Sequence, residues 1–316
     1  MVEVLRPMST GELMDRTLVL YKKHFRLFVG IASLGPATYL LFQLLTIGSA
    51  SLKGGGSNRL GFLSAVSVGV GVVGGFLIML GGMAISHAAT VKAVAAVHLG
   101  RPIGIGEAYR SLKGRFWRVL GVFVCIALLA GLVVLGGFLM VGVVGLILRT
   151  LFTLDAGGGQ VGQIFAAIIG FGVFVVIGIL AIVVWTRYAL SIACCVVEDL
   201  GVIKSIRRSA ALSKGSRFRI FLIYIVFVIL AVIFGAVLGG LAGAAGSLTA
   251  SVPVRLILVY VASFIAGSLT GPLATIGIAL VYYDERVRKE AFDLQLMMSS
   301  LDSTAPPSVT AVPVQS

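Results

Sequence analysis

The sequence predicts an all-α polytopic membrane protein with six transmembrane helices. Its 316 residues are 59% hydrophobic and 12% charged, with a mean hydropathy of +1.09. Soluble domains carry about 25% charged residues and disordered chains are poor in apolar ones, so the composition excludes both classes. Six continuously apolar stretches lack Asp, Glu, Lys and Arg, and each exceeds the roughly 20 residues that a helix needs to cross a bilayer. These stretches are 27–52, 60–91, 119–148, 156–186, 220–254 and 256–283.

Two boundaries of these helices need comment. The first stretch follows 26 residues that hold five Lys and Arg. It is longer than the 7–15-residue apolar region of a cleavable signal, so we expect an uncleaved first helix. The fifth and sixth stretches are separated only by 247–253 and Arg255, and we expect the chain to turn there.

Basic residues are distributed unevenly around the predicted helices. Four of the 25 lysines and arginines, Lys53, Arg59, Arg149 and Arg255, lie in loops on one side. The other 21 lie in the segments 1–26, 87–118, 187–219 and 284–316. By the positive-inside rule, this asymmetry predicts that both termini face the cytoplasm. Juxtamembrane basic residues also attract membrane lipids, anionic ones above all. Because no soluble recognition module is present, we expect no nucleic-acid binding.

Short motifs recur before the first, third and fifth helices. Arg-Pro followed by Gly-Glu occurs at 6–12 and, with the same spacing, at 101–107. The second and third such segments both follow a Leu-Gly pair and both end in Arg-Phe after a Lys-Gly. We therefore predict three repeats, each a basic amphipathic interfacial helix followed by a transmembrane hairpin. The repeats are about 1–99, 100–200 and 201–298, which form a single membrane domain at 1–298, followed by a disordered cytoplasmic tail at 299–316.

The first interfacial helix has the clearest pattern. Ser9-x-x-Glu12 predicts a capping box at its start. Apolar residues then recur at spacings near 3 and 4, opposite a basic face, so the helix can lie in the headgroup plane. The alternative is that it packs on neighbouring helices in the cytoplasmic layer.

Small residues and prolines predict how the membrane helices pack. Small residues at every fourth position let two helix backbones approach closely. We expect this in the fifth helix at Gly235, Gly239 and Gly243, and in the sixth helix at Gly267 and Gly271. Pro36 and Pro272 are expected to kink the first and last helices. Such breaks also occur in transporters, but no ionisable residue accompanies either proline.

Motifs for catalysis are missing from the sequence. His24, His87 and His98 lie in unlike contexts and do not have the spacing of metal ligands. There is no nucleophile elbow, Walker loop or dinucleotide fingerprint. We therefore predict no catalytic, cofactor-binding or metal-binding residues.

The densest motif, 281–293, follows the last membrane helix. Its alternating charges predict the ion pairs Arg286–Glu290 and Lys289–Asp293 on an emerging helix. Such a segment is either an anchoring helix end or a docking surface for a cytoplasmic partner. Together with the basic segments it supplies the candidate contacts for lipid headgroups or a partner, which are Arg6, Arg16, Lys22, Lys23, Arg101, Arg115, Arg207, Arg208, Tyr282, Tyr283, Asp284, Arg286 and Arg288.

Both ends of the chain resemble a known family. The opening Leu5-Arg-Pro, with Gly11-Glu12 and 21–25, and the closing Tyr282-Tyr-Asp-x-Arg-Val-Arg-Lys-Glu-x-Phe-Asp resemble the glycerophosphoryl diester phosphodiesterase membrane-domain family of bacterial and archaeal six-helix proteins. The resemblance covers about 4–295 and implies a bacterial or archaeal cytoplasmic membrane. Glu285 and Ala291 stand where the family tends to have Leu and Gly. In fused relatives a soluble barrel with a His-Arg pair carries the catalysis. This chain has no His-Arg and lacks the ~250 residues of a barrel, so the activity does not carry over.

These observations favour a non-catalytic membrane protein, an accessory or scaffold module that organises lipids or a partner at the cytoplasmic face. A passive channel or transporter, with a pathway between the repeats, is the alternative.

Overall fold

The computed structural model describes residues 8–51, 58–98, 100–101, 103–153, 159–249 and 251–290. All regular structure in this part of the chain is helical. The elements are α1 (Thr10–Lys23), α2 (Phe25–Ala32), α3 (Leu34–Ser51), α4 (Asn58–His98), α5 (Ile105–Arg110), α6 (Phe116–Thr153), α7 (Gly159–Tyr188), α8 (Ser191–Val197), α9 (Val202–Leu212), α10 (Arg217–Ser247) and α11 (Val252–Glu290).

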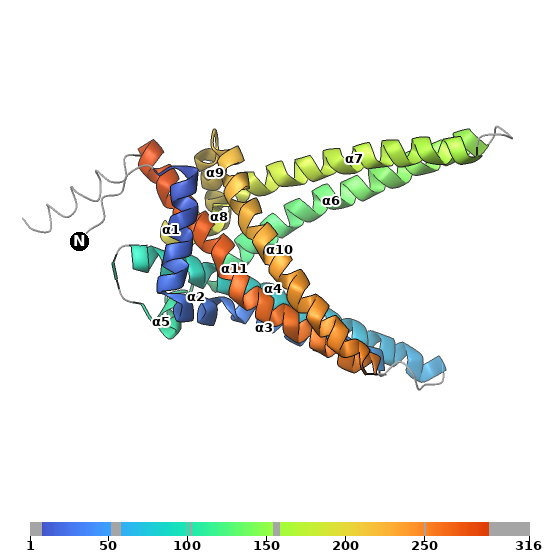
Figure 1. Ribbon diagram of the computed structural model, residues 1–316, viewed down its shortest axis with the longest axis horizontal. Helices are drawn as coiled ribbons and strands as arrows, with labels where there is room; N and C mark the ends of the chain where they lie inside the picture. The colour runs from blue at the N-terminus through green and yellow to red at the C-terminus, as the bar shows by residue number, and fades with distance from the viewer. Residues whose placement is uncertain are drawn as a thin grey trace, which may run out of the picture.

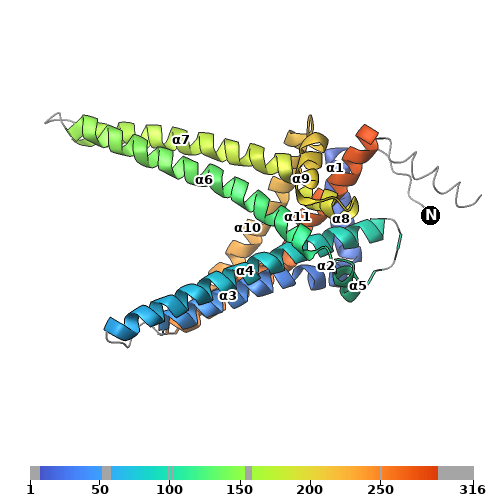
Figure 2. The same ribbon diagram turned by 180° about the vertical axis from the view of Figure 1, so that it is seen from behind.

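Six helical spans within the described residues are long and apolar enough to cross a membrane, which confirms a multi-pass membrane protein. The spanning helices form consecutive hairpins, α2/α3 with α4, α6 with α7, and α10 with α11 (Figure 1). The turn between the last two falls between Ser247 and Val252, as expected. Two hairpins lie against each other through α3, α4 and α11, whereas α6 and α7 diverge from them as a separate arm (Figure 2).

The buried core lies at one end of the molecule. There the short helices α1, α2, α5, α8 and α9 gather around the ends of α4 and α11 (Figure 1). We call this end, which carries the basic segments, the basic end. Its largest fully buried side chains include Tyr282, Phe28 and Leu13. The α6–α7 arm is covered by exposed apolar side chains such as Leu132 and Phe171, as expected for helices solvated by lipid.

Helix α1 has the predicted capping box. The hydroxyl oxygen of Ser9 accepts a hydrogen bond from the backbone N–H of Glu12 at 3.2 Å, and the Glu12 carboxylate accepts one from the N–H of Ser9 at 2.7 Å. The helix packs on α11 and α2, and Leu13 and Thr17 are fully buried in that contact. Of the two arrangements considered for this helix, the structure has the one in which it packs on neighbouring helices.

Pro36 breaks the first spanning helix, as predicted, between Ala32 at the end of α2 and Leu34 at the start of α3. Proline has no N–H, so the carbonyl of Ala32 loses its usual helical donor. The hydroxyl of Ser86 donates to that carbonyl at 3.1 Å. Tyr109 donates to the neighbouring carbonyl of Ile31 at 2.5 Å, and burial raises the pKa of Tyr109 to about 12, so it stays a donor at physiological pH. Pro272, by contrast, lies inside α11 without ending it.

Replacing Ser86 by Ala is expected to destabilise the protein by about 1–2 kcal/mol, because it leaves the buried carbonyl of Ala32 without a donor. The matched control is Ser263→Ala. Ser263 bonds only the carbonyl of Val259 within its own exposed helix turn, and we expect its loss to cost a few tenths of a kcal/mol. SDS titration followed by circular dichroism measures both. Equal losses in the two variants would contradict this role of Ser86.

The glycine contacts differ from the prediction. A Cβ atom added at Gly235, Gly239 or Gly243 would meet no heavy atom within 4 Å, so the close approach expected at these three glycines of α10 is not present. Gly267 does allow a close approach, but to Pro36 of α3, whose Cγ would lie 3.1 Å from its added Cβ. Gly271 meets nothing within 4 Å and borders a cavity. Spacing alone identifies a small face of a helix but not the face that the partner helix contacts.

Candidate functional site

The charged end of α11 is buried in the basic end. Asp284 is 1% exposed and its carboxylate accepts three hydrogen bonds. The donors are the backbone N–H of Met8 at 2.7 Å, Arg219 at 2.5 Å and Arg288 at 2.8 Å. Both arginines also donate to the carbonyl of Met8, at 2.8 and 2.5 Å. We call Met8, Arg219, Asp284 and Arg288 the Asp284 clasp. It joins the start of α1 to α10 and α11.

Glu285, also 1% exposed, is held by two cations beside the clasp. Lys289 pairs with it at 3.0 Å and Arg219 at 3.5 Å. Lys289 also donates to the carbonyls of Leu212 and Lys214, the latter at 2.8 Å, and so ties α11 to the end of α9. A buried carboxylate needs such partners because desolvation alone costs several kcal/mol.

A second cluster lies on another face of the same helix end. Glu198, after α8, accepts hydrogen bonds from Tyr282 at 2.7 Å and Arg208 at 3.0 Å. Glu290 pairs with Arg208 and, at 3.2 Å, with Arg286. Burial alone would lower the pKa of Arg208, but Glu198 and Glu290 outweigh it and raise that pKa. This Glu198 cluster fixes α8 and α9 to α11.

The motif at the end of α11 therefore connects segments of this chain. The predicted pair Arg286–Glu290 is confirmed. Lys289 pairs with Glu285, and its predicted partner Asp293 lies outside the described residues. Tyr282, Tyr283 and Asp284 are buried, which differs from the exposed location that contact with lipid or a partner requires.

The other candidate residues are divided by exposure. Arg6 and the tail at 299–316 lie outside the described residues. Arg115, which pairs with Asp199 at 3.0 Å, is half-buried, as are Arg16, Arg208 and Arg286. The side chain of Arg288 is 40% exposed, but it belongs to the Asp284 clasp. The candidates with exposed side chains outside that clasp are Lys22, Lys23, Arg101 and Arg207.

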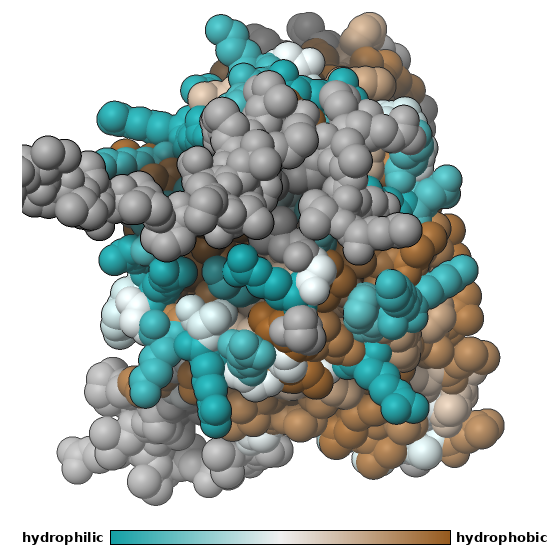
Figure 3. All heavy atoms as spheres, turned by 90° about the vertical axis from the view of Figure 1, so that its left-hand side faces the viewer, coloured by the Kyte–Doolittle hydropathy of each residue, from teal (hydrophilic) through white to brown (hydrophobic). Residues whose placement is uncertain are grey.

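Exposed aromatic residues mark the start of each spanning hairpin. Phe25 begins α2, and Trp117 and Phe218 are second in α6 and α10, with exposed fractions of 43%, 78% and 76%. Each adjoins an arginine, as Arg26 follows Phe25. We call these three side chains the interfacial aromatics. Figure 3 looks onto the basic end, where hydrophilic side chains gather beside the hydrophobic surface of the arms. Aromatic and basic residues together are typical of a membrane interface.

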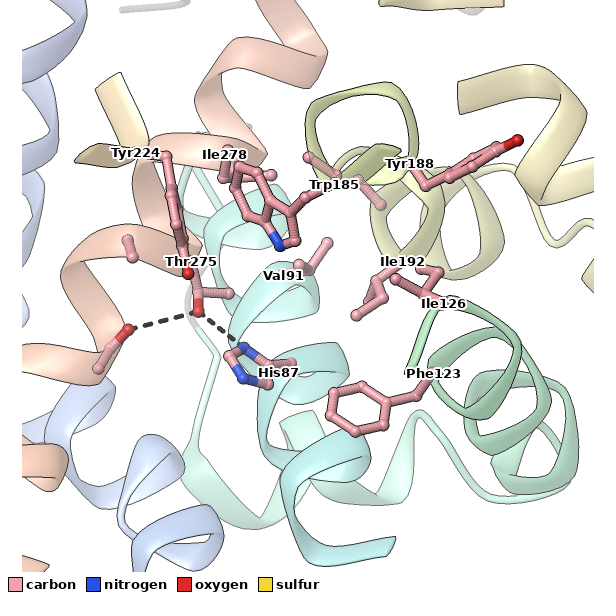
Figure 4. A pocket seen from close by; sticks show the side chains of 14 residues that line it. His87, Val91, Phe123, Ile126, Trp185, Tyr188, Ile192, Tyr224, Thr275 and Ile278 are labelled. Atoms are coloured by element: carbon pink, nitrogen blue, oxygen red, sulfur yellow. Dashed lines mark hydrogen bonds between the residues drawn. The ribbon is translucent and has the colours of Figure 1, made fainter. Parts of the chain in front are cut away.

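A cavity of about 330 Å³ lies where the arm of α6 and α7 meets α4, α10 and α11 (Figure 4). Trp185 and Tyr224, whose ring centroids are 3.7 Å apart, form one wall. His87 lies opposite, stacked near Phe123 at 6.2 Å, and its Nδ1 is hydrogen-bonded to the hydroxyl of Thr275 at 2.9 Å. Aliphatic residues, among them Ile126, Ile192 and Ile278, complete the lining.

A second cavity of about 220 Å³ lies between α3, α4 and α11, and it shares His87, Gly271 and Thr275 with the first. Gly271 was predicted only to pack helices. The cavity was not predicted, because Trp185 and Tyr224 lie 39 residues apart on different helices. A signal was present: both are amphipathic aromatics within otherwise apolar stretches.

The described residues contain no group of three or more His, Cys, Asp or Glu side chains that could hold a metal ion. Comparison of the chain with protein-family models, with curated proteins and with solved structures finds no match. Function is therefore inferred from the geometry of the basic end and of the cavity.

Proposed function

We propose that the protein is a non-catalytic membrane module that binds anionic lipid headgroups at its basic end and thereby organises lipids, or holds a protein partner, at the cytoplasmic face. The observation that carries this proposal is the set of interfacial aromatics, each beside an arginine at the start of a hairpin. The amphipathic ring of Trp117 favours the headgroup level, exposed phenylalanines enter the boundary between headgroups and acyl chains, and each basic residue near an anionic surface contributes about 1 kcal/mol.

Topology is part of the same proposal. The basic end faces the cytoplasm of a bacterial or archaeal cell, with both termini on that side, as the positive-inside rule predicts. The three hairpins are repeats, each preceded by a short amphipathic helix. The recurring sequence motifs support this assignment, and so does the alternation of short and spanning helices along the chain. The resemblance to the phosphodiesterase membrane-domain family supports the location, and purified protein alone is expected to show no turnover.

The test compares two triple variants by native mass spectrometry. Lys22, Lys23 and Arg26→Gln removes exposed cations beside Phe25, and Arg59, Arg149 and Arg255→Gln removes three arginines in or beside the loops at the other end. With equal amounts of phosphatidylglycerol and phosphatidylcholine, we expect the parent to retain phosphatidylglycerol. The first variant should lose about tenfold or more of that preference and the second little of it. No preference in the parent, or equal losses in both variants, would refute the proposal.

A passive channel has less support. The lining of the larger cavity contains no Asp, Glu, Lys or Arg among the described residues, and the two cavities are separated by the hydrogen-bonded pair His87–Thr275. Flux of a small solute from liposomes that falls when Pro272 is replaced would favour the channel instead.

A further inference from the structure

The larger cavity lies between the spanning helices, close to the basic end. His87 precedes Lys92 by five residues on α4, and Thr275 precedes Asp284 by nine on α11. At a rise of 1.5 Å per residue these separations are about 8 and about 14 Å. Taking Lys92 and Asp284 as the level at which α4 and α11 leave the membrane, these separations place the cavity near the level where lipid headgroups meet acyl chains. With increasing distance from the basic end, the α6–α7 arm diverges from the other spanning helices (Figure 1).

The charge of the lining decides which occupants fit. None of the fourteen described residues around the cavity is Lys, Arg, Asp or Glu. A phosphate or carboxylate in such surroundings would have no opposite charge to offset its desolvation, which costs several kcal/mol or more. The exposed Arg187 does not line the cavity, and its guanidinium carbon lies 5.5 Å from the ring centroid of the lining residue Tyr188. A charged headgroup is therefore disfavoured inside.

Polar groups nevertheless converge on the cavity. The hydroxyl of Thr275 and the ring of His87 come from two facing helices, and the indole of Trp185 points into the space between them (Figure 4). Tyr224 also lines the cavity. A few polar groups placed in a mostly apolar and aromatic cavity are typical of a site that fixes the orientation of an apolar ligand.

We infer that this cavity binds one uncharged lipid, whose head carries hydrogen-bonding oxygen atoms and whose tail leaves between the diverging hairpins. The head accepts or donates hydrogen bonds at Thr275, His87 and Trp185, and the aromatic walls cover its faces. The ester carbonyls and hydroxyl of a diacylglycerol have this chemistry, and so does the ring of a lipid quinone. This site goes beyond the proposed surface contact with anionic lipids and does not depend on it.

Trp185 offers a direct reporter, because the chain contains only two tryptophans and the other, Trp117, is exposed. In a Trp117→Phe background, the fluorescence of Trp185 is measured while dioctanoylglycerol, a decyl-substituted benzoquinone or dioctanoyl phosphatidylglycerol is added to the detergent-solubilised protein. We expect a saturable change with an uncharged probe and none with phosphatidylglycerol. The comparison of dioctanoylglycerol with the quinone identifies which of the two chemistries the site prefers.

Two variants locate the binding. Gly271→Leu places a side chain in the cavity and should weaken binding about tenfold or more. Its matched control is Gly142→Leu on α6, because both glycines are exposed with open space around an added Cβ. Thr275→Val removes only the hydroxyl and should weaken binding about fivefold. The inference is overturned if neither uncharged probe gives saturation, if phosphatidylglycerol binds as tightly, or if Gly271→Leu binds like its control.

Discussion

Asp284→Asn is expected to lower the free energy of unfolding by about 3–5 kcal/mol, the range for a buried ion pair that loses one partner. The neutral amide leaves Arg219 and Arg288 without their shared carboxylate beside the carbonyl of Met8. SDS titration followed by circular dichroism measures the loss. The control is Asp199→Asn, whose carboxylate is 50% exposed although it also pairs with two arginines, and which should cost under about 1 kcal/mol.

A double variant separates the clasp from a general effect of the substitution. Asp284→Asn combined with Arg288→Met should lose less than the sum of the two single variants, because one unpaired charge is removed with the carboxylate. Strict additivity, or an Asp284→Asn variant as stable as Asp199→Asn, would contradict the clasp. Charge reversal at Asp284 is consequently unsuited to a search for partners, since it disrupts the fold. Exposed cations such as Lys22 and Arg207 suit that purpose.

Gly82→Ala is expected to destabilise the α3–α4 hairpin by about 2–3 kcal/mol, because close packing leaves no room for one methyl group. The added Cβ would overlap the side chain of Thr38, whose own Cβ would lie 2.8 Å away, so the helices themselves must move apart. Thermal unfolding in detergent, followed by circular dichroism, measures the effect.

The adjacent Gly81 supplies the control for this prediction. A Cβ atom added at Gly81 would lie 3.9 Å from the ring of Phe116, which is an ordinary van der Waals contact. Gly81→Ala should therefore be neutral or stabilise the helix by up to about 1 kcal/mol, the difference in helix propensity. Combining Gly82→Ala with Thr38→Gly should recover most of the loss. Equal behaviour of Gly81→Ala and Gly82→Ala would show that the contact with Thr38 is unimportant.

Local features of this chain were predictable from its sequence. The charge-free stretches gave six spanning helices because a bilayer sets their length, and Ser9 and Glu12 gave a capping box because both partners lie within one turn. The pair Arg286–Glu290 follows from the helix period in the same way.

The arrangement of distant segments was not predictable. The alternating charges of 284–290 have the pattern of a solvated helix end, yet their partners Met8, Glu198 and Arg219 come from segments that no local pattern connects to them. Similarly, the spacing of the glycines in α10 did not indicate which face of that helix a neighbouring helix would contact. The cavity is lined by residues of α4, α6, α7, α8, α10 and α11, and no local pattern in the sequence encodes how these helices are placed relative to one another.

The Asp284 clasp also has a consequence for biosynthesis. Met8 leaves the ribosome 276 residues before Asp284, which at 5–20 residues per second is about 14 to 55 s earlier. During that interval the spanning helices are synthesised one after another, and neither the backbone of Met8 nor, after its own translation, the guanidinium of Arg219 has the carboxylate of Asp284 to bind. The basic end is therefore completed only when the last helix has been translated, and a nascent chain that stops short of that helix remains open at this end.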